Sequence, residues 1–221
     1  DIVGADFFNV IKMMKDRLGA NAVRIQLPIG AEADFAGLVD LVNMKAEMYY
    51  DNDGVDVRTE EIPEHLRDQA EEYRMLLLDA VADADDELME KYLEEGDLSA
   101  EDIIAGIRKA TIANTMVPVC CGTSYRNKGI QPLLNAIVDF LPSPLDVPAP
   151  VGTSKDGERE IQTTCSDSEP FAALAFKIVA DPFVGKLTFF RVYSGVLEKG
   201  TTVLNCTKGK TERMGRILQM H

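Results

Sequence analysis

The sequence has few of the residues from which many catalytic and metal sites are built. It contains no tryptophan, two histidines and four cysteines among 221 residues. Cys120 and Cys121 are neighbours, whereas Cys165 and Cys206 stand alone, so no spacing typical of zinc sites or of a disulfide framework is present. With one of its two histidines at the last position, the chain offers no Ser/His/Asp or Cys/His catalytic group. We therefore expect reduced, buried thiols and no bound metal.

Long apolar runs are also absent. No stretch of 18 or more apolar residues occurs, and the start does not resemble a signal peptide, so we expect a cytoplasmic protein without a membrane partner. The chain opens at Asp1 without methionine and ends directly after a strand-like run. We interpret both ends as cut, and the length of 221 residues as two domains taken from a larger protein.

The negative charge is concentrated in one segment. The net charge is −14. Residues 60–102 alone carry 17 acidic and three basic side chains, while the rest of the chain carries 20 of each sign. Phosphate repulsion then argues against direct nucleic-acid binding by this segment, and a basic protein partner fits better.

The acidic segment has the apolar spacing of one long helix, from about Pro63 to Leu93. Its inward stripe is expected to comprise Leu66, Ala70, Tyr73, Leu77, Val81, Ala84, Leu88 and Tyr92. Asp79, Asp83, Asp86 and Glu90 would follow one another along a second face, where like charges weaken the helix slightly. That face is either solvated surface or a docking site for a basic partner. A further helix is expected from Ser99, which has the spacing of a capping box.

The segments around the acidic region predict a mixed architecture. A helix is expected to end at Gly19, followed by a strand through Val23, Ile25 and Leu27, an extended run over 35–50 and a turn at 51–54. After the acidic helices we expect a strand over 116–121, a polar loop over 122–129 and a helix over 130–141. The inward residues of that last helix are predicted to be Ile130, Leu133, Leu134, Ile137 and Leu141.

A proline-rich linker then leads to a region with the period-two pattern of strands. From Phe171 onward we expect a small antiparallel barrel with turns at 181–182 and 208–209. Residues 195–202 resemble a phosphate loop but carry Thr201 where its lysine is required, and we interpret them as a hairpin turn. Because we interpret both ends of the chain as cut, the strands that would cover the helices over 6–18 and 130–141 are expected to be missing. The apolar faces of these helices and one barrel edge should then be exposed, which favours self-association.

Four stretches of the sequence together resemble bacterial elongation factor G. They read DPFVGKLTFFRVYSGVLEKGTTVLN at 181–205, ELMEKYL at 87–93, NKGIQPLLNAIVDFLPSPLDVPAP at 127–150 and GRILQMH at the end. The resemblance implies an α/β fold: the remnant of a P-loop GTPase domain with an inserted α+β subdomain called G prime, followed by a truncated antiparallel β-barrel. It also implies a ribosome-dependent GTPase that drives translocation in protein synthesis.

The resemblance divides the chain into five parts. Residues 1–25 and 116–145 belong to the GTPase domain, 26–115 to the G prime insertion, 146–169 to a linker and 170–221 to β-barrel domain II. The phosphate loop, both switches and the catalytic histidine would lie before Asp1. The chain alone is therefore expected to have no catalytic residue and no cofactor, while GTP or GDP and Mg²⁺ would bind to the longer protein.

The resemblance also assigns the guanine side of the nucleotide site. Asp1 corresponds to the last residue of the Asn-Lys-x-Asp motif, whose carboxylate accepts two hydrogen bonds from the base. Gly122, Thr123, Ser124 and Tyr125 correspond to the loop that closes over the base. The family usually has Ser-Ala-Phe after the glycine, so this chain differs at three positions, although a backbone N–H can still donate.

The resemblance further implies that the acidic helix docks on the ribosomal stalk protein through Asp79, Asp83 and Asp86. Two alternatives remain open. The first is a free-standing acidic module that docks on the ribosome without nucleotide. The second is a paralogous translational GTPase of the release-factor or ribosomal-protection type, against which the stretch 181–205 argues.

Overall fold

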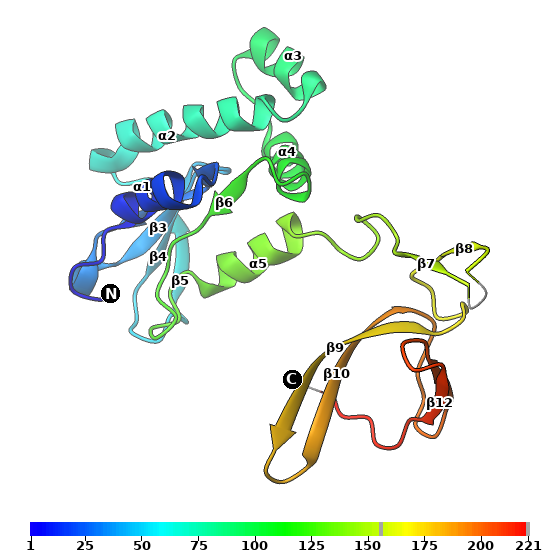
Figure 1. The fold of residues 1–221 in the computed structure, drawn as a ribbon. Coiled ribbons are helices and arrows are strands. Elements are labelled where there is room, and N and C mark those ends of the chain that lie inside the picture. Colours follow the sequence, from blue (N-terminus) through cyan, green and yellow to red (C-terminus); the bar gives the residue numbers. More distant parts are fainter. Residues whose placement is uncertain (155–156, 220–221) are drawn as a thin grey trace. The chain divides into compact units, whose positions relative to one another are not determined.

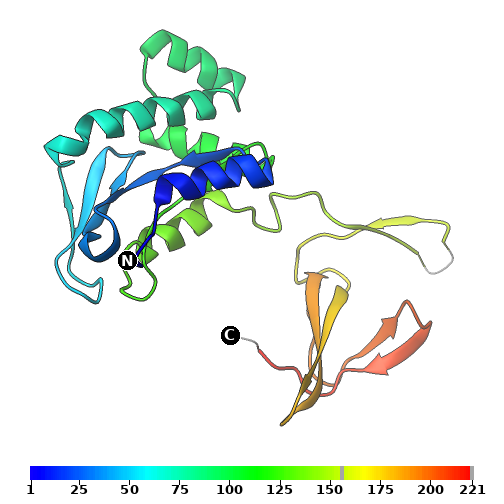
Figure 2. The ribbon, with the colours of Figure 1, turned by 60° about the vertical axis from the view of Figure 1, so that its left-hand side comes forward.

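The computed structural model describes residues 1–154 and 157–219. The chain forms two compact units, residues 1–142 and 143–221. In Figures 1 and 2 the helices belong to the first unit, whereas the second is built from strands and connecting segments.

The first helix ends at the predicted cap. α1 spans Phe7–Leu18, and the Asp6 carboxylate accepts the amide of Asn9 at 2.9 Å. Gly19 ends the helix with φ 62°, a left-handed conformation that glycine adopts without a Cβ penalty. Ile11 is the buried residue of this helix, whereas Val10 and Leu18 are exposed, so part of its apolar side has no cover within the unit.

Two sheets follow. β1 (Ala22–Arg24) pairs in parallel with β6 (Val117–Val119). β2 (Gln26–Ile29), β3 (Gly37–Asp40), β4 (Lys45–Tyr49) and β5 (Val57–Glu60) form an antiparallel sheet in chain order, with a short 3₁₀ helix, η1 (Glu32–Asp34), between β2 and β3. The prediction of one extended run over 35–50 was wrong, because the Asp40 carboxylate accepts the amide of Val42 at 2.8 Å and Met44 takes φ 53°, which turns the chain back.

The acidic segment forms two helices, and the prediction of one long helix was wrong. α2 spans Glu64–Ala82 and α3 spans Asp86–Glu95. Asp85 has an extended backbone, and its carboxylate accepts the amide of Glu87 at 3.0 Å, so it caps a new helix where the previous one stops. The predicted apolar stripe is confirmed, since its residues are buried or pack against the core in both helices.

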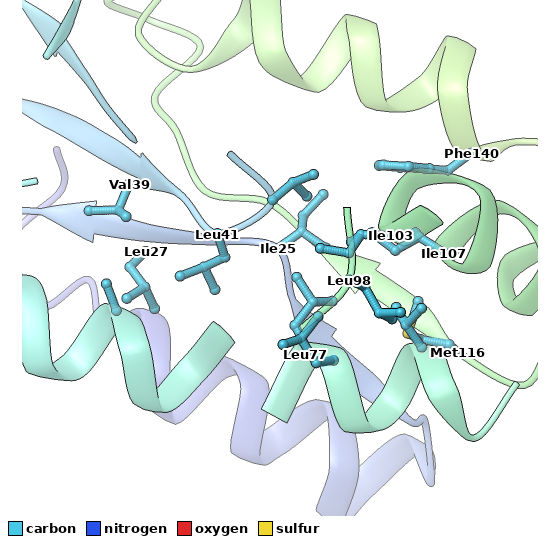
Figure 3. Close-up of a cluster of buried hydrophobic side chains, with 14 of the residues drawn as sticks. Ile25, Leu27, Val39, Leu41, Leu77, Leu98, Ile103, Ile107, Met116 and Phe140 are labelled. Atoms are coloured by element: carbon cyan, nitrogen blue, oxygen red, sulfur yellow. The ribbon is translucent and has the colours of Figure 1, made fainter. Parts of the chain in front are cut away.

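α4 (Ala100–Ile112) begins at the predicted capping residue, because Ser99 Oγ accepts the amide of Asp102 at 3.2 Å. Its Ile103 and Ile107 are fully buried together with Leu77 of α2. Figure 3 shows these side chains in one cluster with Leu27 and Val39 of the sheet and with Leu41, which directly follows β3. Complete burial of each such side chain contributes about 1.5–3 kcal/mol, so this cluster is the main source of stability of the first unit.

α5 (Ile130–Phe140) differs from the expectation for its apolar stripe. Phe140 is its buried residue, whereas Leu133, Leu134, Ile137 and Leu141 are 40–56% exposed. The helix therefore contacts the core cluster through Phe140 and Ala136 and leaves much of its apolar face exposed. The separate prediction that apolar faces of α1 and α5 are exposed is confirmed by this geometry.

The second unit consists of antiparallel hairpins. β9 (Ala172–Asp181) pairs with β10 (Gly185–Ser194), and β11 (Thr202–Asn205) pairs with β12 (Lys210–Arg213). The turns at 181–182 and 208–209 are where the sequence predicted them. Residues 195–202 connect β10 to β11, which lie in different sheets, so the prediction of a hairpin turn there was wrong.

The hairpins remain separate. Among the described residues, the four strands β9–β12 form two-stranded sheets and do not close into a barrel, so strand edges are open as predicted. A third hairpin, β7 (Val151–Thr153) with β8 (Glu160–Gln162), lies within the stretch expected to be a linker. The period-two pattern predicted antiparallel strands, but it did not predict which strands pair with each other.

Candidate functional site

The polar loop 122–129 follows β6 and leads directly into α5. Thr123 and Lys128 exchange two backbone hydrogen bonds, of 2.8 and 3.1 Å, which close the loop at its base. A Cβ atom on Gly122 would lie 2.7 Å from the carbonyl oxygen of Lys128, and Gly129 takes φ 81°. The base of the loop therefore requires glycine at both ends, which explains why the predicted site begins with Gly122.

The tip of the loop presents backbone donors. The amides of Ser124, Tyr125 and Arg126 have no hydrogen-bond partner among the residues that the structure describes. Tyr125 is 96% exposed, and the turn is held by the Asn127 amide, which donates to the Ser124 carbonyl at 3.3 Å. Three successive N–H groups are thus available to a ligand with an acceptor.

Asp1 lies beside this loop. Its Oδ2 atom is 3.7 Å from Nε of Arg126, and its side chain is 19% exposed. The predicted site residues at the start of the chain and in the loop are therefore brought together. A carboxylate accepts hydrogen bonds and backbone amides donate them, so this part of the unit offers both kinds of group to a ligand.

A hollow of about 220 Å³ adjoins the loop and is lined by Cys120, Cys121, Gly122, Ser124, Gly129, Ile130 and Leu133. Burial raises the pKa of Cys120 to about 11 and that of Cys121 to about 12. Both thiols are thus protonated at neutral pH and suited to packing rather than to nucleophilic chemistry. Cys165 and Cys206 are exposed, so the expectation of burial was wrong for these two.

Residues outside the loop hold it in place, and no sequence pattern pointed to them. The Gly129 amide donates to the Tyr49 hydroxyl at 2.8 Å, and the Cys121 amide donates to Oε1 of Gln26 at 3.2 Å. The side chain of Asn127 donates to the Asp53 carbonyl at 3.3 Å. These contacts join positions 74 to 95 residues apart, a distance at which a spacing pattern carries no information.

The candidate docking residues lie around the break between α2 and α3. Asp79 is in the last turn of α2, Asp83 ends that helix and Asp86 begins α3, and all three are exposed. They do not follow one helical face as predicted. Burial, followed by the charge of Asp79 and a hydrogen bond with it, raises the pKa of Tyr92, so Asp79 already has a contact within the unit.

Neighbouring charges anchor α3. The Asp85 carboxylate forms an ion pair with Lys109 of α4 at 2.5 Å, and Lys91 pairs with Asp102. These pairs hold the acidic helix against α4 while Asp83, Asp86 and Glu90 face solvent. The arrangement presents solvent-facing carboxylates on a fixed surface.

The described residues offer neither a metal centre nor a membrane-spanning helix. No group of three or more His, Cys, Asp or Glu side chains in this part of the chain is arranged to hold a metal ion. Among the helices described, none is long and apolar enough to cross a membrane.

Comparisons with known proteins agree with the architecture. The family model of elongation factor G domain 2 matches residues 170–221. A crystal structure of a protein from Thermus thermophilus is similar over 96% of this chain, with 27% identity and a TM-score of 0.71. The chain spans 28% of the length of that protein. The domain match at residues 170–221 and the similarity to the Thermus protein over nearly the whole chain both support a chain of the elongation factor G type.

Proposed function

We propose that the chain is part of a ribosome-dependent GTPase that drives translocation of transfer RNA and messenger RNA, and that it acts in the cytoplasm. The domain 2 match at 170–221 and the similarity to the Thermus protein support this assignment. The observation that carries the nucleotide part of the proposal is the position of the Asp1 carboxylate, 3.7 Å from Nε of Arg126, in a loop whose tip amides have no partner among the described residues.

In this proposal the site reads the edge of guanine. The two oxygens of Asp1 accept the ring N–H and the exocyclic amino group, a bidentate and charge-assisted arrangement. The guanine carbonyl accepts from an amide at the tip, at Ser124 or Tyr125. Gly122 and Thr123 contribute by closing the loop, since the Thr123 backbone exchanges two hydrogen bonds with Lys128. The backbone supplies the donors, so the unusual Thr-Ser-Tyr side chains are compatible with the role.

We further propose that the chain by itself does not hydrolyse GTP. Its 221 residues contain no phosphate loop, so the contacts to phosphates and Mg²⁺ would come from the rest of a longer protein. Base contacts alone leave most of the binding free energy unmade. Isothermal titration calorimetry of the chain with GDP, with ADP as control, is expected to show no submicromolar binding. A submicromolar GDP affinity would refute the division of the site.

The acidic surface formed by Asp79, Asp83 and Asp86 is proposed to dock on a basic face of the ribosomal stalk protein. Its support is the concentration of negative charge in residues 60–102 and the exposure of these three carboxylates. Rim charges of this kind mainly raise the association rate, and salt screens them. We therefore expect binding that weakens steeply as the salt concentration rises.

The docking test compares two triple charge reversals. Asp79→Lys, Asp83→Lys and Asp86→Lys together are expected to abolish binding to purified stalk protein in a low-salt titration. The matched control changes the exposed Asp167, Glu169 and Glu198 of the second unit to lysine, with the same change in net charge. Equal binding by both variants would show that the three carboxylates are only solvated surface.

A paralogous translational GTPase and a nucleotide-free docking module are the alternative functions. The match to elongation factor G domain 2 favours the elongation factor over release-factor and ribosomal-protection types. The docking module predicts stalk binding without any response of loop 122–129 to guanine nucleotide. A titration that follows the loop amides separates the two.

A further inference from the structure

The antiparallel sheet β2–β5 has two differently used faces. Val39 and Ala46 lie in the core cluster with α2, and they face each other across β3 and β4. The alternate residues Leu38 and Glu47 are also paired across these strands and point to the opposite face. Tyr49 shares that second face with Glu47, because it is two residues further along β4. The face opposite the α2 core therefore carries Leu38, Glu47 and Tyr49.

Loop 122–129 rests on this second face. A Cβ atom on Gly129 would lie 3.3 Å from Cδ2 of Leu38, and the Gly129 amide donates to the Tyr49 hydroxyl at 2.8 Å. A phenol oxygen can accept a hydrogen bond, so the Tyr49 hydroxyl is the acceptor for this amide. Tyr49 is only 6% exposed, so the packing of the sheet holds the hydroxyl that fixes the loop.

The turn after β4 contacts loop 122–129 and the start of α5 at a second point. A Cβ atom on Gly54 would lie 2.3 Å from the Asn127 carbonyl oxygen, and Gly54 takes φ 66°. The side chain of Gln131 donates to the Gly54 carbonyl at 3.1 Å. Loop 122–129 is therefore clamped at Gly129 by Tyr49 and at Asn127 by the turn, which leaves the tip amides at 124–126 as its free donors.

We propose that Tyr49 is a positioning residue for base recognition by loop 122–129. It touches no nucleotide itself and acts by fixing the loop backbone, so that the tip amides face the carbonyl of guanine. This inference rests on the proposed function, because it assumes that the loop reads guanine. It assigns to the sheet a role in nucleotide selectivity in addition to covering the α2 core.

The chain offers a matched control in the next residue. Tyr50 is 54% exposed, and its hydroxyl donates to the carboxylate of Glu60 at 2.7 Å, away from the loop. Tyr49→Phe and Tyr50→Phe each remove one hydroxyl from a tyrosine of β4 or its immediate end. Only the first leaves the amide of Gly129 without an acceptor.

The first measurement is amide hydrogen exchange followed by NMR. Loss of one buried hydrogen bond is expected to speed exchange at Gly129 by about fivefold to tenfold in Tyr49→Phe. Amides of α2 and α4 should keep their rates, and Tyr50→Phe should match the wild type throughout. Unchanged Gly129 exchange in Tyr49→Phe overturns the proposal.

The second measurement follows the loop amides during titration with millimolar GDP or ADP. In the wild type, the amides of Ser124 and Tyr125 are expected to shift with GDP and not with ADP. Tyr49→Phe should require about fivefold more GDP, whereas Tyr50→Phe should not. Equal GDP response in the two variants overturns the positioning role. A wild-type loop that ignores GDP contradicts the guanine part of the proposed function, while the exchange rates still judge whether Tyr49 holds the loop.

Discussion

Among the charged side chains of the first unit that reach the surface, Arg74 is the one whose replacement we expect to lower stability most. One guanidinium nitrogen donates to the carbonyls of Leu41 and Val42, both at 2.8 Å. The other donates to Asp97 at 2.9 Å and to the Leu98 carbonyl at 3.3 Å. Arg74 thus joins the turn after β3 to the segment between α3 and α4, with only 15% of its side chain exposed.

Replacement by methionine keeps the length of the aliphatic stem and removes all four hydrogen bonds. A hydrogen bond to a charged group contributes about 1.5–3 kcal/mol, and carbonyls left unpaired add a penalty. The Asp97 end is exposed, so we count mainly the three carbonyl contacts. Because contacts that share one side chain are not additive, we expect a total loss of about 3–5 kcal/mol, the range for removing one partner of a buried charged interaction. A single domain is stable by about 5–15 kcal/mol, so this loss is a large part of the total.

Urea unfolding followed by far-UV circular dichroism at 222 nm tests this expectation, because the described helices lie in the first unit. Arg58→Met is the matched control, since Arg58 pairs with Asp56 at the surface and such pairs contribute about 0–1 kcal/mol. Arg74→Lys should fall between them, because an ammonium reaches fewer of the four acceptors. If Arg74→Met and Arg58→Met unfold within about 1 kcal/mol of each other, the account of Arg74 as a structural clamp is wrong.

Three further predictions concern packing, pH and thiol chemistry. A Cβ atom on Gly106 would lie 2.4 Å from Cγ1 of Val81 and 2.9 Å from Cδ1 of Leu88, so Gly106→Ala should lower stability by about 1–3 kcal/mol in urea unfolding. The same change should cost less in a Val81→Ala background, because the closer of the two contacts is then absent, and an equal cost in both backgrounds would contradict this. Hydrogen bonds from Lys91 and then Ser99 lower the pKa of Asp102. Its contribution to stability is therefore present above the unfolded pKa of about 3.9 and is lost as pH falls through the folded pKa. Asp102→Asn should reduce the drop in Tm between pH 7 and pH 3, and an unchanged drop would contradict this. The exposed Cys165 and Cys206 should react with iodoacetamide at pH 8 well before Cys120 and Cys121, because the buried thiols remain protonated. Mass spectrometry measures the four rates, and equal rates would contradict the burial of Cys120 and Cys121.

Local signals in the sequence predicted local structure well. The caps at Gly19 and Ser99 and the apolar stripe from Leu66 to Tyr92 identify helices because a helix end or face is determined by residues within a few positions. The break between α2 and α3 at Asp85 could not be predicted in this way, because the apolar periodicity of the acidic segment continues across it. Only the capping side chain of Asp85, with its ion pair to Lys109, marks the start of the new helix.

Nonlocal pairing could not be predicted in the same way. The strand patterns after Phe171 suit a barrel and separate hairpins equally, because period two defines a face and not a neighbour. The guanine-side residues Asp1 and 122–125 came from resemblance, and the structure adds the contacts of Arg126 and Tyr49 that spacing could not suggest. Their assignment as a nucleotide site stays a prediction.

The two proposed surfaces of the first unit lie on opposite sides of one sheet. α2, which carries Asp79, packs on the face with Val39 and Ala46, while loop 122–129 rests on the face with Leu38 and Tyr49. Val39, Leu38 and Ala46 are fully buried, and close-packed interiors transmit displacement instead of absorbing it. If a partner shifts α2, the sheet either stays in place or moves together with Tyr49. In the second case stalk binding and guanine affinity are linked through Tyr49, and the Tyr49→Phe variant should lose that linkage while it keeps the docking surface intact.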